Sequence, residues 1–272
     1  MRPLRRLFRP RLALLNGVSA TAGYLLHPAE VRAIHLTLLF CGVTLLAAGG
    51  SALNQVLERD LDAMMARTRQ RPLPQGELTP VAATAVGACV ILCGVALLAA
   101  TGGMLPPLLG AAALAWYLLV YTPLKRRTPF ALALGALCGA LPPLIGWSLA
   151  GGDPMDYRPV LLAGLLYIWQ VPHFWLLQHR HADDYRRAGI PLAGAASRGG
   201  DRAGLSRLWI IALIAGSALL PAFGIIERHV AFWYIAFPVP LIVMTLFRFE
   251  SALFPYLNLF PLMVTIILLV QK

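Results

Sequence analysis

Residues 34–57, IHLTLLFCGVTLLAAGGSALNQVL, contain no Asp, Glu, Lys or Arg, whereas the residues that follow, ERDLDAMMARTRQRPLPQGELTP (58–80), are dense in charge of both signs. Three acids and four arginines fall within 18 residues, from Glu58 to Gln75. A helix needs about 20 mostly apolar residues to cross the hydrocarbon core of a bilayer. The two segments therefore predict a membrane-spanning helix that ends in a charged loop.

The rest of the chain repeats this apolar pattern. Of its 272 residues, 58% are hydrophobic and 13% are charged, which excludes one large or two small soluble domains. We predict an all-α fold, a polytopic membrane bundle of nine transmembrane helices that forms a single domain over residues 1–272. Prolines at 142–143, 172, 238 and 240 are expected to kink their spans. The expected spans are 11–26, 34–57, 81–101, 105–122, 129–150, 159–178, 206–226, 230–247 and 254–271.

The distribution of Lys and Arg predicts the orientation. The N-terminal tail, three alternate loops (58–80, 123–128 and 179–205 with Arg207) and Arg248 hold 19 of the 23 basic residues. Because cytoplasmic loops are enriched in Lys and Arg, we place the N-terminus in the cytoplasm and the C-terminus outside, across a bacterial-type cytoplasmic (inner) membrane. This topology explains much of the net charge of +11, so the expected surroundings are a lipid bilayer and no nucleic acid.

Eight of the 12 acids share the cytoplasmic side, which this topology does not explain. Asn54, Glu58 and Asp62 are spaced i, i+4 and i+8, so on a helix they share one face. Carboxylate and amide oxygens on one face suit a hard cation such as Mg²⁺. The alternative is a helix end with solvated acids, but the helix dipole disfavours acids at a C-terminal end. Asp60 points about 200° away from Glu58 and is a weaker candidate ligand.

Basic residues follow these acids along the chain. Arg67 and Arg71 lie in the same charged loop, and a guanidinium group can bind two phosphate oxygens at once. Lys125 and Arg126 lie in YTPLKRRTP (121–129), a loop that taken alone is more typical of a topology signal. Acids that hold a cation beside bases that hold an anion are the arrangement that a metal-bound diphosphate requires.

A third charged region, WQVPHFWLLQHRHADDYRRAGIP (169–191), begins inside an expected span. His173 lies there at membrane depth, where an ionisable residue indicates a functional role by default. The alternative is a neutral histidine that is hydrogen-bonded to a helix carbonyl. His173, Arg180 and Asp184 are spaced i, i+7 and i+11 and share one helix face. Asp183 and Asp184 either hold a second cation or neutralise the arginines that follow them.

Four segments together resemble the UbiA superfamily of membrane prenyltransferases. They are NQVLERDLDAMMARTRQRPLPQGELTP (54–80), YTPLKRRTP (121–129), GALPPLIGW (139–147) and WQVPHF…DDYRRAGIP (169–191). The last two are similar to the heme O synthase (protoheme IX farnesyltransferase) branch. The resemblance implies a helical bundle with a cavity open to the lipid and a cytoplasmic cap of loops. The family motif N-x-x-x-D-x-x-x-D falls on Asn54, Glu58 and Asp62, and Glu58 departs from the usual aspartate by one methylene.

The resemblance also implies an activity, transfer of the farnesyl group of farnesyl diphosphate to a vinyl group of heme b, with Mg²⁺ as cofactor. Two alternatives stay open: a UbiA-type transferase acting on an aromatic quinone precursor, and a non-catalytic membrane assembly or transport protein on the same fold. On the first interpretation, Asn54, Glu58, Asp62 and Asp184 hold the metal, Arg67, Arg71, Lys125 and Arg126 hold the diphosphate, His173 contacts heme, and Asp60, Asp183 and Arg180 are secondary candidates.

Overall fold

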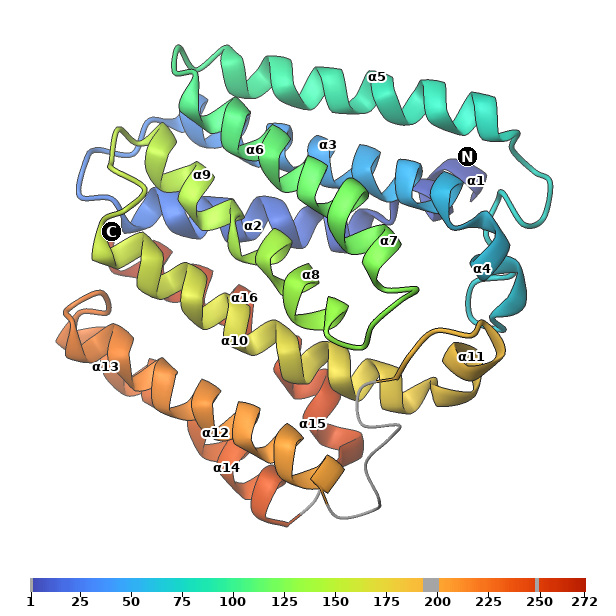
Figure 1. Cartoon of the computed structure of the whole chain (residues 1–272). Helices are drawn as coiled ribbons and strands as arrows, with labels where there is room; N and C mark the ends of the chain where they lie inside the picture. The colour runs from blue at the N-terminus through green and yellow to red at the C-terminus, as the bar shows by residue number, and fades with distance from the viewer. Residues whose placement is uncertain (1, 193–200, 248–249) are drawn as a thin grey trace.

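The computed structural model describes residues 2–192, 201–247 and 250–272, and every regular element within these ranges is helical (Figure 1). The prediction of an all-α fold is therefore confirmed. The helices are α1 (Arg2–Phe8), α2 (Pro10–Leu26), α3 (Ala33–Leu57), α4 (Arg59–Met64), α5 (Pro80–Ala99), α6 (Leu105–Ala115), a π-helix η1 (Trp116–Tyr121), α7 (Thr122–Leu124), α8 (Ala131–Ala140), α9 (Pro142–Leu149), α10 (Tyr157–Arg180), α11 (Ala182–Arg187), α12 (Asp201–Ala222), α13 (Arg228–Ile235), α14 (Pro238–Leu246), α15 (Glu250–Leu257) and α16 (Phe260–Val270).

Seven helical stretches in the described ranges are long and apolar enough to cross a membrane, so the chain is an integral, multi-pass membrane protein. The other two expected spans also coincide with helices, but these are shorter: α2 has 17 residues, and the apolar part of α12 is Arg207–Ala222. The seven stretches are Ala33–Leu57, Pro80–Ala99, Leu105–Leu124, Ala131–Leu149, Tyr157–Arg180, Arg228–Leu246 and Ala252–Val270.

Prolines divide two of the expected spans. The chain leaves helix α8 at Ala140 and starts α9 at Pro142, and α14 likewise starts at Pro238. A proline is tolerated in the first turn of a helix because its missing N–H group would have no partner there. Helix α10, in contrast, continues across Pro172 without a break.

Glycines bring α2 and α9 close together. A Cβ atom at Gly146 would lie 1.9 Å from the carbonyl oxygen of Ala20, and a Cβ atom at Gly23 would lie 1.9 Å from the carbonyl oxygen of Pro143. Lipid supplies little hydrophobic driving force between helices, so close backbone packing at small residues carries much of their association. These two glycines therefore fix the spacing of helices that line the interior of the bundle.

Apolar side chains lie both inside the bundle and on its outer surface. Trp147, Leu162 and Phe260 are among the fully buried residues of the largest interior cluster. Val81 and Leu119 are 79% and 73% exposed, on helical stretches that are long and apolar enough to span a membrane. A large apolar surface is unfavourable in water but is stable against acyl chains. The outer surface is thus suited to lipid.

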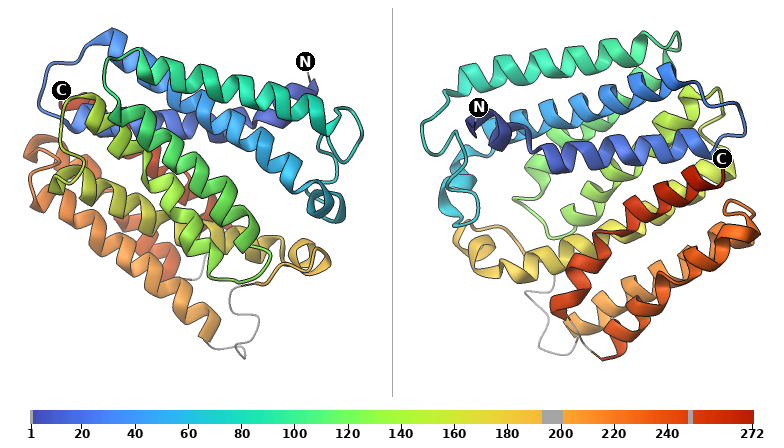
Figure 2. Two further views of the ribbon diagram at one scale, coloured as in Figure 1. Left: turned by 45° about the horizontal axis from the view of Figure 1, so that its top comes forward. Right: turned by 180° about the vertical axis from the view of Figure 1, so that it is seen from behind.

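The charged segments gather at one end of the bundle (Figure 1, right). Helices α1, α4 and α11 lie there, although they are far apart in the sequence, and Figure 2 places the two chain ends at opposite ends of the molecule. At the opposite end, Lys272 Nζ donates a hydrogen bond of 2.6 Å to the carbonyl oxygen of His27. The described parts of the loops that we expect in the cytoplasm, 58–80, 123–128 and 179–192, therefore share one end of the fold. Residues 193–200 and Arg248, which we expect on the same side, lie outside the described residues.

The N-terminal helix is fastened to this charged end. Gln55 Nε2, near the end of α3, donates to the carbonyl oxygen of Leu7 at 2.7 Å. Arg6 Nη1 donates to the carbonyl oxygen of Gln70 at 2.6 Å. The chain then turns into α2 at Arg9, which has a left-handed backbone with φ 47°. This turn places Arg9 beside the loop that follows α4.

Candidate active site

The helix that was expected to carry Asn54, Glu58 and Asp62 is interrupted at its second acidic position. Helix α3 ends at Leu57, Glu58 has φ −116° and ψ 15°, and α4 begins at Arg59. The helical i, i+4 hydrogen bonds between these residues are nevertheless kept, because Glu58 N donates to Asn54 O at 3.0 Å and Asp62 N donates to Glu58 O at 2.8 Å. The expectation that Asp62 lies at a helix C-terminus is wrong. Asp62 lies in the first turn of α4, where the helix dipole favours a carboxylate.

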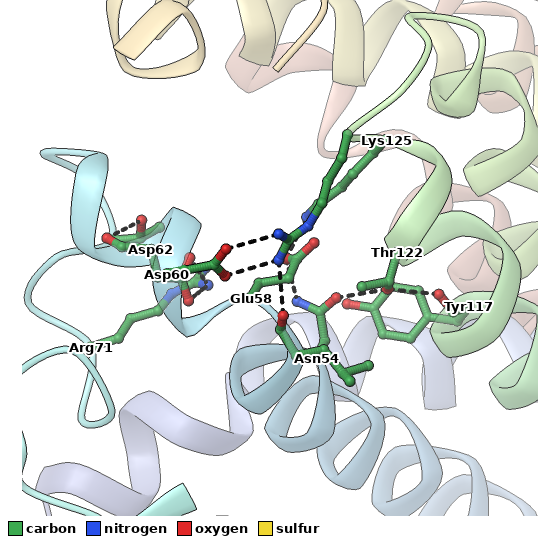
Figure 3. A network of polar contacts seen from close by, with 11 residues as sticks. Asn54, Glu58, Asp60, Asp62, Arg71, Tyr117, Thr122 and Lys125 are labelled. Atoms are coloured by element: carbon green, nitrogen blue, oxygen red, sulfur yellow. Dashed lines mark hydrogen bonds and ion pairs between the residues drawn. The ribbon is translucent and has the colours of Figure 1, made fainter. Parts of the chain in front are cut away.

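A buried polar network joins α3 to the segment after the π-helix (Figure 3). Asn54 and Glu58 are 4% and 2% exposed. Thr122 Oγ1 donates to Asn54 Oδ1 at 2.9 Å, and Asn54 Nδ2 donates to Glu58 Oε2 at 2.9 Å. Lys125 Nζ forms an ion pair with the same Glu58 oxygen. Burial lowers the pKa of Lys125, and the charge of Glu58 opposes that shift.

Asp62 forms the second buried ion pair. Its exposed fraction is 3%, and Arg71 Nη1 lies 2.7 Å from both of its carboxylate oxygens. Thr68 Oγ1 donates to the carbonyl oxygen of Asp62 at 3.0 Å and so orders the loop between them. Glu58 and Asp62, two of the predicted metal-binding carboxylates, are thus each paired with a predicted diphosphate-binding base.

Asp60 and Arg126 form a separate pair on the outside of this network. Arg126 Nη1 and Nη2 donate to the two Asp60 oxygens at 2.8 and 2.9 Å, and Nη2 also donates to the carbonyl oxygen of Leu57 at 2.9 Å. The hydrogen bond from Arg126 lowers the pKa of Asp60. The Asp60 side chain is 58% exposed, whereas Glu58 is buried.

Asp184 is buried, at 5% exposure, and binds the loop that follows α4. Its Oδ1 accepts from the backbone N–H of Ala66 and its Oδ2 from that of Arg67, both at 3.0 Å. Arg187 forms an ion pair with Oδ1. Burial raises the pKa of Asp184, but these hydrogen bonds outweigh burial and hold the pKa below its usual value. Asp184 therefore connects α11 to the backbone of a predicted diphosphate-binding residue.

Asp183 and Arg180 lie further out. The Asp183 side chain is 83% exposed and pairs with Arg186 at 2.8 Å, which matches the expectation that it neutralises a following arginine. The Arg180 guanidinium lies 5.9 Å from the centroid of the Phe254 ring. Neither side chain lines the cavity that lies between the charged network and the apolar interior.

A cavity of about 360 Å³ brings the charged network and the apolar interior together. Of the predicted site residues, those that line it are Asn54, Glu58, Asp62, Arg67, Arg71, Lys125 and His173, and those that do not are Asp60, Arg126, Arg180, Asp183 and Asp184. Apolar side chains of α2, α3, α6, α8 and α10 complete the lining. A polar end on an otherwise apolar pocket suits a ligand with a charged head and a hydrocarbon tail.

Arg9 also lines this cavity, and sequence reasoning missed it. Arg9 is one of five arginines in the N-terminal tail, and its spacing does not distinguish it from the others. Its left-handed φ of 47° is the feature that sets it apart, and an arginine has no intrinsic preference for that conformation. Burial lowers the pKa of Arg9, and Tyr117 opposes that shift. The site therefore includes a further cation beside Arg67 and Arg71.

The π-helix η1 supplies two aromatic walls that were also not predicted. Tyr117 and Tyr121 both line the cavity, with their rings stacked at 18° and their centroids 5.9 Å apart. Lys125 Nζ lies 5.8 Å from the centroid of the Tyr121 ring. Single π-turns within α-helices are frequent at functional sites. The run WYLLVY carries no spacing signal for a wider turn, so the sequence alone did not reveal it.

His173 lies in α10 with its ring between two aromatic side chains. Its centroid is 5.2 Å from that of Trp169 and 5.1 Å from that of Phe254, with interplanar angles of 29° and 21°. Its Nδ1 is buried and has no hydrogen-bond partner among the described residues. The alternative interpretation, in which a neutral His173 donates a hydrogen bond to a helix carbonyl, is thus not met at this nitrogen.

The donor atoms at the polar end fit a magnesium ion. No three His, Cys, Asp or Glu side chains of the described ranges converge as a metal site. Glu58 and Asp62 offer two carboxylates and Asn54 an amide oxygen, and Glu58 Oε1 is buried without a hydrogen-bond partner in the described part of the chain. Mg²⁺ is usually bound by one or two carboxylates together with substrate phosphates and water. Three protein oxygens that leave the other coordination positions to phosphate and water are therefore suited to this ion.

Two UbiA homologs of known structure share this fold. The apo structure of a UbiA homolog from Aeropyrum pernix superposes with a TM-score of 0.78 at 20% identity, over 97% of this chain and 98% of that chain. A UbiA homolog from Archaeoglobus fulgidus bound to GPP and Mg²⁺ gives a TM-score of 0.68 at 14% identity, over 98% of this chain and 99% of that chain. At these identities the similarity establishes the fold alone.

Sequence relatives are much closer. A protoheme IX farnesyltransferase from Geobacter sulfurreducens is 59% identical over 268 residues, which cover 97% of both chains. One from Oleidesulfovibrio alaskensis is 42% identical over 228 residues, covering 84% of this chain and 80% of the relative. Residues 16–254 match the model of the UbiA prenyltransferase family. The chain therefore belongs to the UbiA prenyltransferase family and, within it, groups with the protoheme IX farnesyltransferases.

Proposed function

We propose that this protein transfers the farnesyl group of farnesyl diphosphate to a vinyl group of heme b and so forms heme O. The observation that carries this function is the 59% identity, over nearly the whole chain, to a protoheme IX farnesyltransferase. The site supports it independently, because one cavity combines an end rich in acids and bases with apolar walls. A prenyl diphosphate has the same division between a charged head and a hydrocarbon tail.

The buried ion pairs suggest how the diphosphate is received. Glu58 with Lys125 and Asp62 with Arg71 neutralise one another in the structure. We propose that a metal-bound diphosphate replaces both pairs: its cation takes the carboxylates, and its phosphate oxygens take the bases. Arg67 and Arg9 line the same end and add two positive charges toward the phosphates.

Asn54, Glu58 and Asp62 are the residues that we propose to hold Mg²⁺, and a homolog of this fold from Archaeoglobus fulgidus was solved with GPP and Mg²⁺. When bound, the ion would neutralise part of the diphosphate charge and so make it a better leaving group. Asp184 is a different case, because both of its oxygens accept backbone hydrogen bonds. We propose that Asp184 positions Arg67 and does not bind the ion.

The reaction breaks the bond between C1 of the farnesyl group and the diphosphate oxygen, and the electron pair leaves with the diphosphate. Lys125, Arg71, Arg67 and Arg9 stabilise the charge that develops on this leaving group. The π electrons of the vinyl group form the new carbon–carbon bond to C1. Water then adds to the remaining vinyl carbon and loses a proton, which leaves a hydroxyethyl group. Tyr121 and the apolar walls shield the allylic cation from earlier capture by water.

For the membrane arrangement, we propose nine spans with the N-terminus in the cytoplasm and the C-terminus outside, in a bacterial-type inner membrane. The clustering of the basic loops at one end of the bundle supports this orientation. Reporter fusions should therefore place the 58–80, 123–128 and 179–205 loops in the cytoplasm and Lys272 outside. A cytoplasmic C-terminus would mean that one span is miscounted.

Membranes that contain the protein should convert heme b to a more hydrophobic heme when farnesyl diphosphate and Mg²⁺ are supplied. Chromatography and mass spectrometry of the extracted hemes should detect the added farnesyl group and one added hydroxyl group. Chelation of divalent ions should abolish the product, and added Mg²⁺ should restore it. Prenylation of an aromatic quinone precursor without heme O would contradict the proposed acceptor, and no prenyl transfer at all would favour a non-catalytic assembly or transport role.

Glu58→Gln should lower kcat at least tenfold and raise the Mg²⁺ concentration needed for half-maximal rate. The carboxamide keeps the shape of the side chain but removes a charged oxygen, and tenfold corresponds to about 1.4 kcal/mol of activation free energy. Glu58→Asp, which restores the family motif, should retain activity and serves as the matched control. If the Gln variant keeps both its rate and its Mg²⁺ requirement, Glu58 is not part of the site.

Asp184→Asn should raise KM for farnesyl diphosphate about tenfold and leave the Mg²⁺ requirement unchanged. The substitution places the amide N–H₂ group of asparagine against a backbone N–H group of the Arg67 loop, so one hydrogen bond is lost. A hydrogen bond to a charged group contributes about 1.5–3 kcal/mol. Asp183→Asn, at the neighbouring exposed position, should leave both quantities unchanged. Initial rates over a grid of substrate and Mg²⁺ concentrations separate the two effects. A raised Mg²⁺ requirement in Asp184→Asn would instead make Asp184 a metal ligand.

A further inference from the structure

Gln170 of α10 is a polar side chain in the lining of the cavity and is 6% exposed. Its Nε2 donates to the carbonyl oxygens of Ala136 at 3.1 Å and Leu166 at 3.2 Å. An amide nitrogen carries two hydrogens, so both are used and the orientation of the amide is fixed. Within the described ranges Oε1 accepts no hydrogen bond and is not sealed off by protein atoms, so it is open to the cavity.

The space for this amide comes from Gly139 of α8. A Cβ atom at Gly139 would lie 2.2 Å from Gln170 Oε1 and 2.6 Å from Nε2, so a larger residue would displace the amide. Gln170 precedes Arg180, the last residue of α10, by ten residues, which is about 15 Å along a helix axis. The amide is therefore remote from the charged end of the bundle, where α10 leads into α11 (Figure 1).

Asn258 offers a second amide oxygen in the same lining. Its Nδ2 donates to the carbonyl oxygen of Phe254 at 3.0 Å, and in the described part of the chain its Oδ1 accepts no hydrogen bond. Trp169 Nε1 donates to the carbonyl oxygen of Leu257 at 2.7 Å, so the residues that follow these two, Gln170 and Asn258, belong to neighbouring parts of the lining. Both amides have used their nitrogens on carbonyl groups, and each keeps an acceptor.

A ligand that satisfies these two oxygens must donate hydrogen bonds. The farnesyl chain has no donor, and the ionised propionates of heme are acceptors themselves. Of the reactants in the proposed reaction, water is the one that carries two O–H groups. An unpaired acceptor in an apolar interior is costly, and a buried water needs two or more polar partners. A water that donates both hydrogens to the amides keeps its lone pairs for bond formation.

We propose that Gln170 Oε1 and Asn258 Oδ1 hold the water that adds to the vinyl carbon of heme b. This inference rests on the proposed function, because it specifies the last step of that reaction. Once C1 of the farnesyl group is bonded to the vinyl group, a lone pair of this water forms the C–O bond. The O–H bond breaks and the proton passes finally to the diphosphate, so heme b, farnesyl diphosphate and water give heme O and diphosphate.

The same cation has a second possible fate. Without a water held beside it, it loses a proton from the adjacent carbon and forms an alkene, with the diphosphate again as the final proton acceptor and no water consumed. The two amides therefore direct the reaction toward the alcohol, through the orientation of one reactant.

The test measures which product forms. Purified full-length protein in detergent is given heme b, farnesyl diphosphate and Mg²⁺, and mass spectrometry distinguishes heme O from the prenylated alkene, which is lighter by one water. Gln170→Met, which keeps the length of the side chain but has no amide, should raise the ratio of alkene to heme O at least tenfold. Gln178→Met, further along the same helix and also in the cavity lining, is the matched control and should keep the original ratio.

A conservative variant and a second position complete the test. Gln170→Glu, whose neutral carboxyl group has one donor and one acceptor, should restore heme O as the main product. Asn258→Leu, which is similar in size, should raise the share of alkene as Gln170→Met does.

An unchanged product ratio in Gln170→Met, with farnesyl diphosphate still consumed, would overturn this inference and leave the proposed function standing. If Gln170→Met consumes no farnesyl diphosphate, the ratio in Asn258→Leu decides in the same way. If the original protein forms neither prenylated heme, the proposed function fails and this inference fails with it.

Discussion

The ion pair between Glu58 and Lys125 is the contact on which the charged end of the molecule depends. The Glu58 side chain is 3% exposed, so its charge is stable only with a partner beside it. Removal of one partner of a buried pair typically costs about 3–5 kcal/mol, because the other charge is left unpaired. Since Glu58 follows α3 and Lys125 follows α7, this requirement also fixes the π-helix and its tyrosines against α3.

The same pairing keeps the site electrically balanced before substrate arrives. Carboxylates that could bind a cation and bases that could bind an anion lie within hydrogen-bonding distance of each other, and each satisfies its neighbour. A ligand that carries both a cation and an anion can replace these contacts without leaving a bare charge in the membrane. A free cation or a free anion could not do so, because it would displace one partner and strand the other.

Much of this fold could be predicted because lipid imposes a simple rule on sequence. Each apolar run that is long enough to span is helical, although some runs are divided between two or more helices. The regular spacing of Asn54, Glu58 and Asp62 brings them to one cavity with Arg71 and Lys125. The features that were missed depend on contacts between distant segments. Arg9 enters the cavity through one unusual backbone angle. Asp184 was named as a candidate metal ligand, but its contacts with backbone N–H groups more than 100 residues away follow from no side-chain pattern.

The π-helix η1 has a consequence for how this protein can change over evolutionary time. A wider turn accommodates one residue more than an α-turn, and each residue of an α-helix advances the chain by about 100°. Deletion of a single residue between Trp116 and Tyr121 would therefore restore regular α geometry while Thr122 and Lys125 keep their register with Asn54 and Glu58. The buried contacts at this end can thus tolerate a change in the length of this one segment, whereas a tyrosine within it would turn by about 100° and change the wall of the cavity.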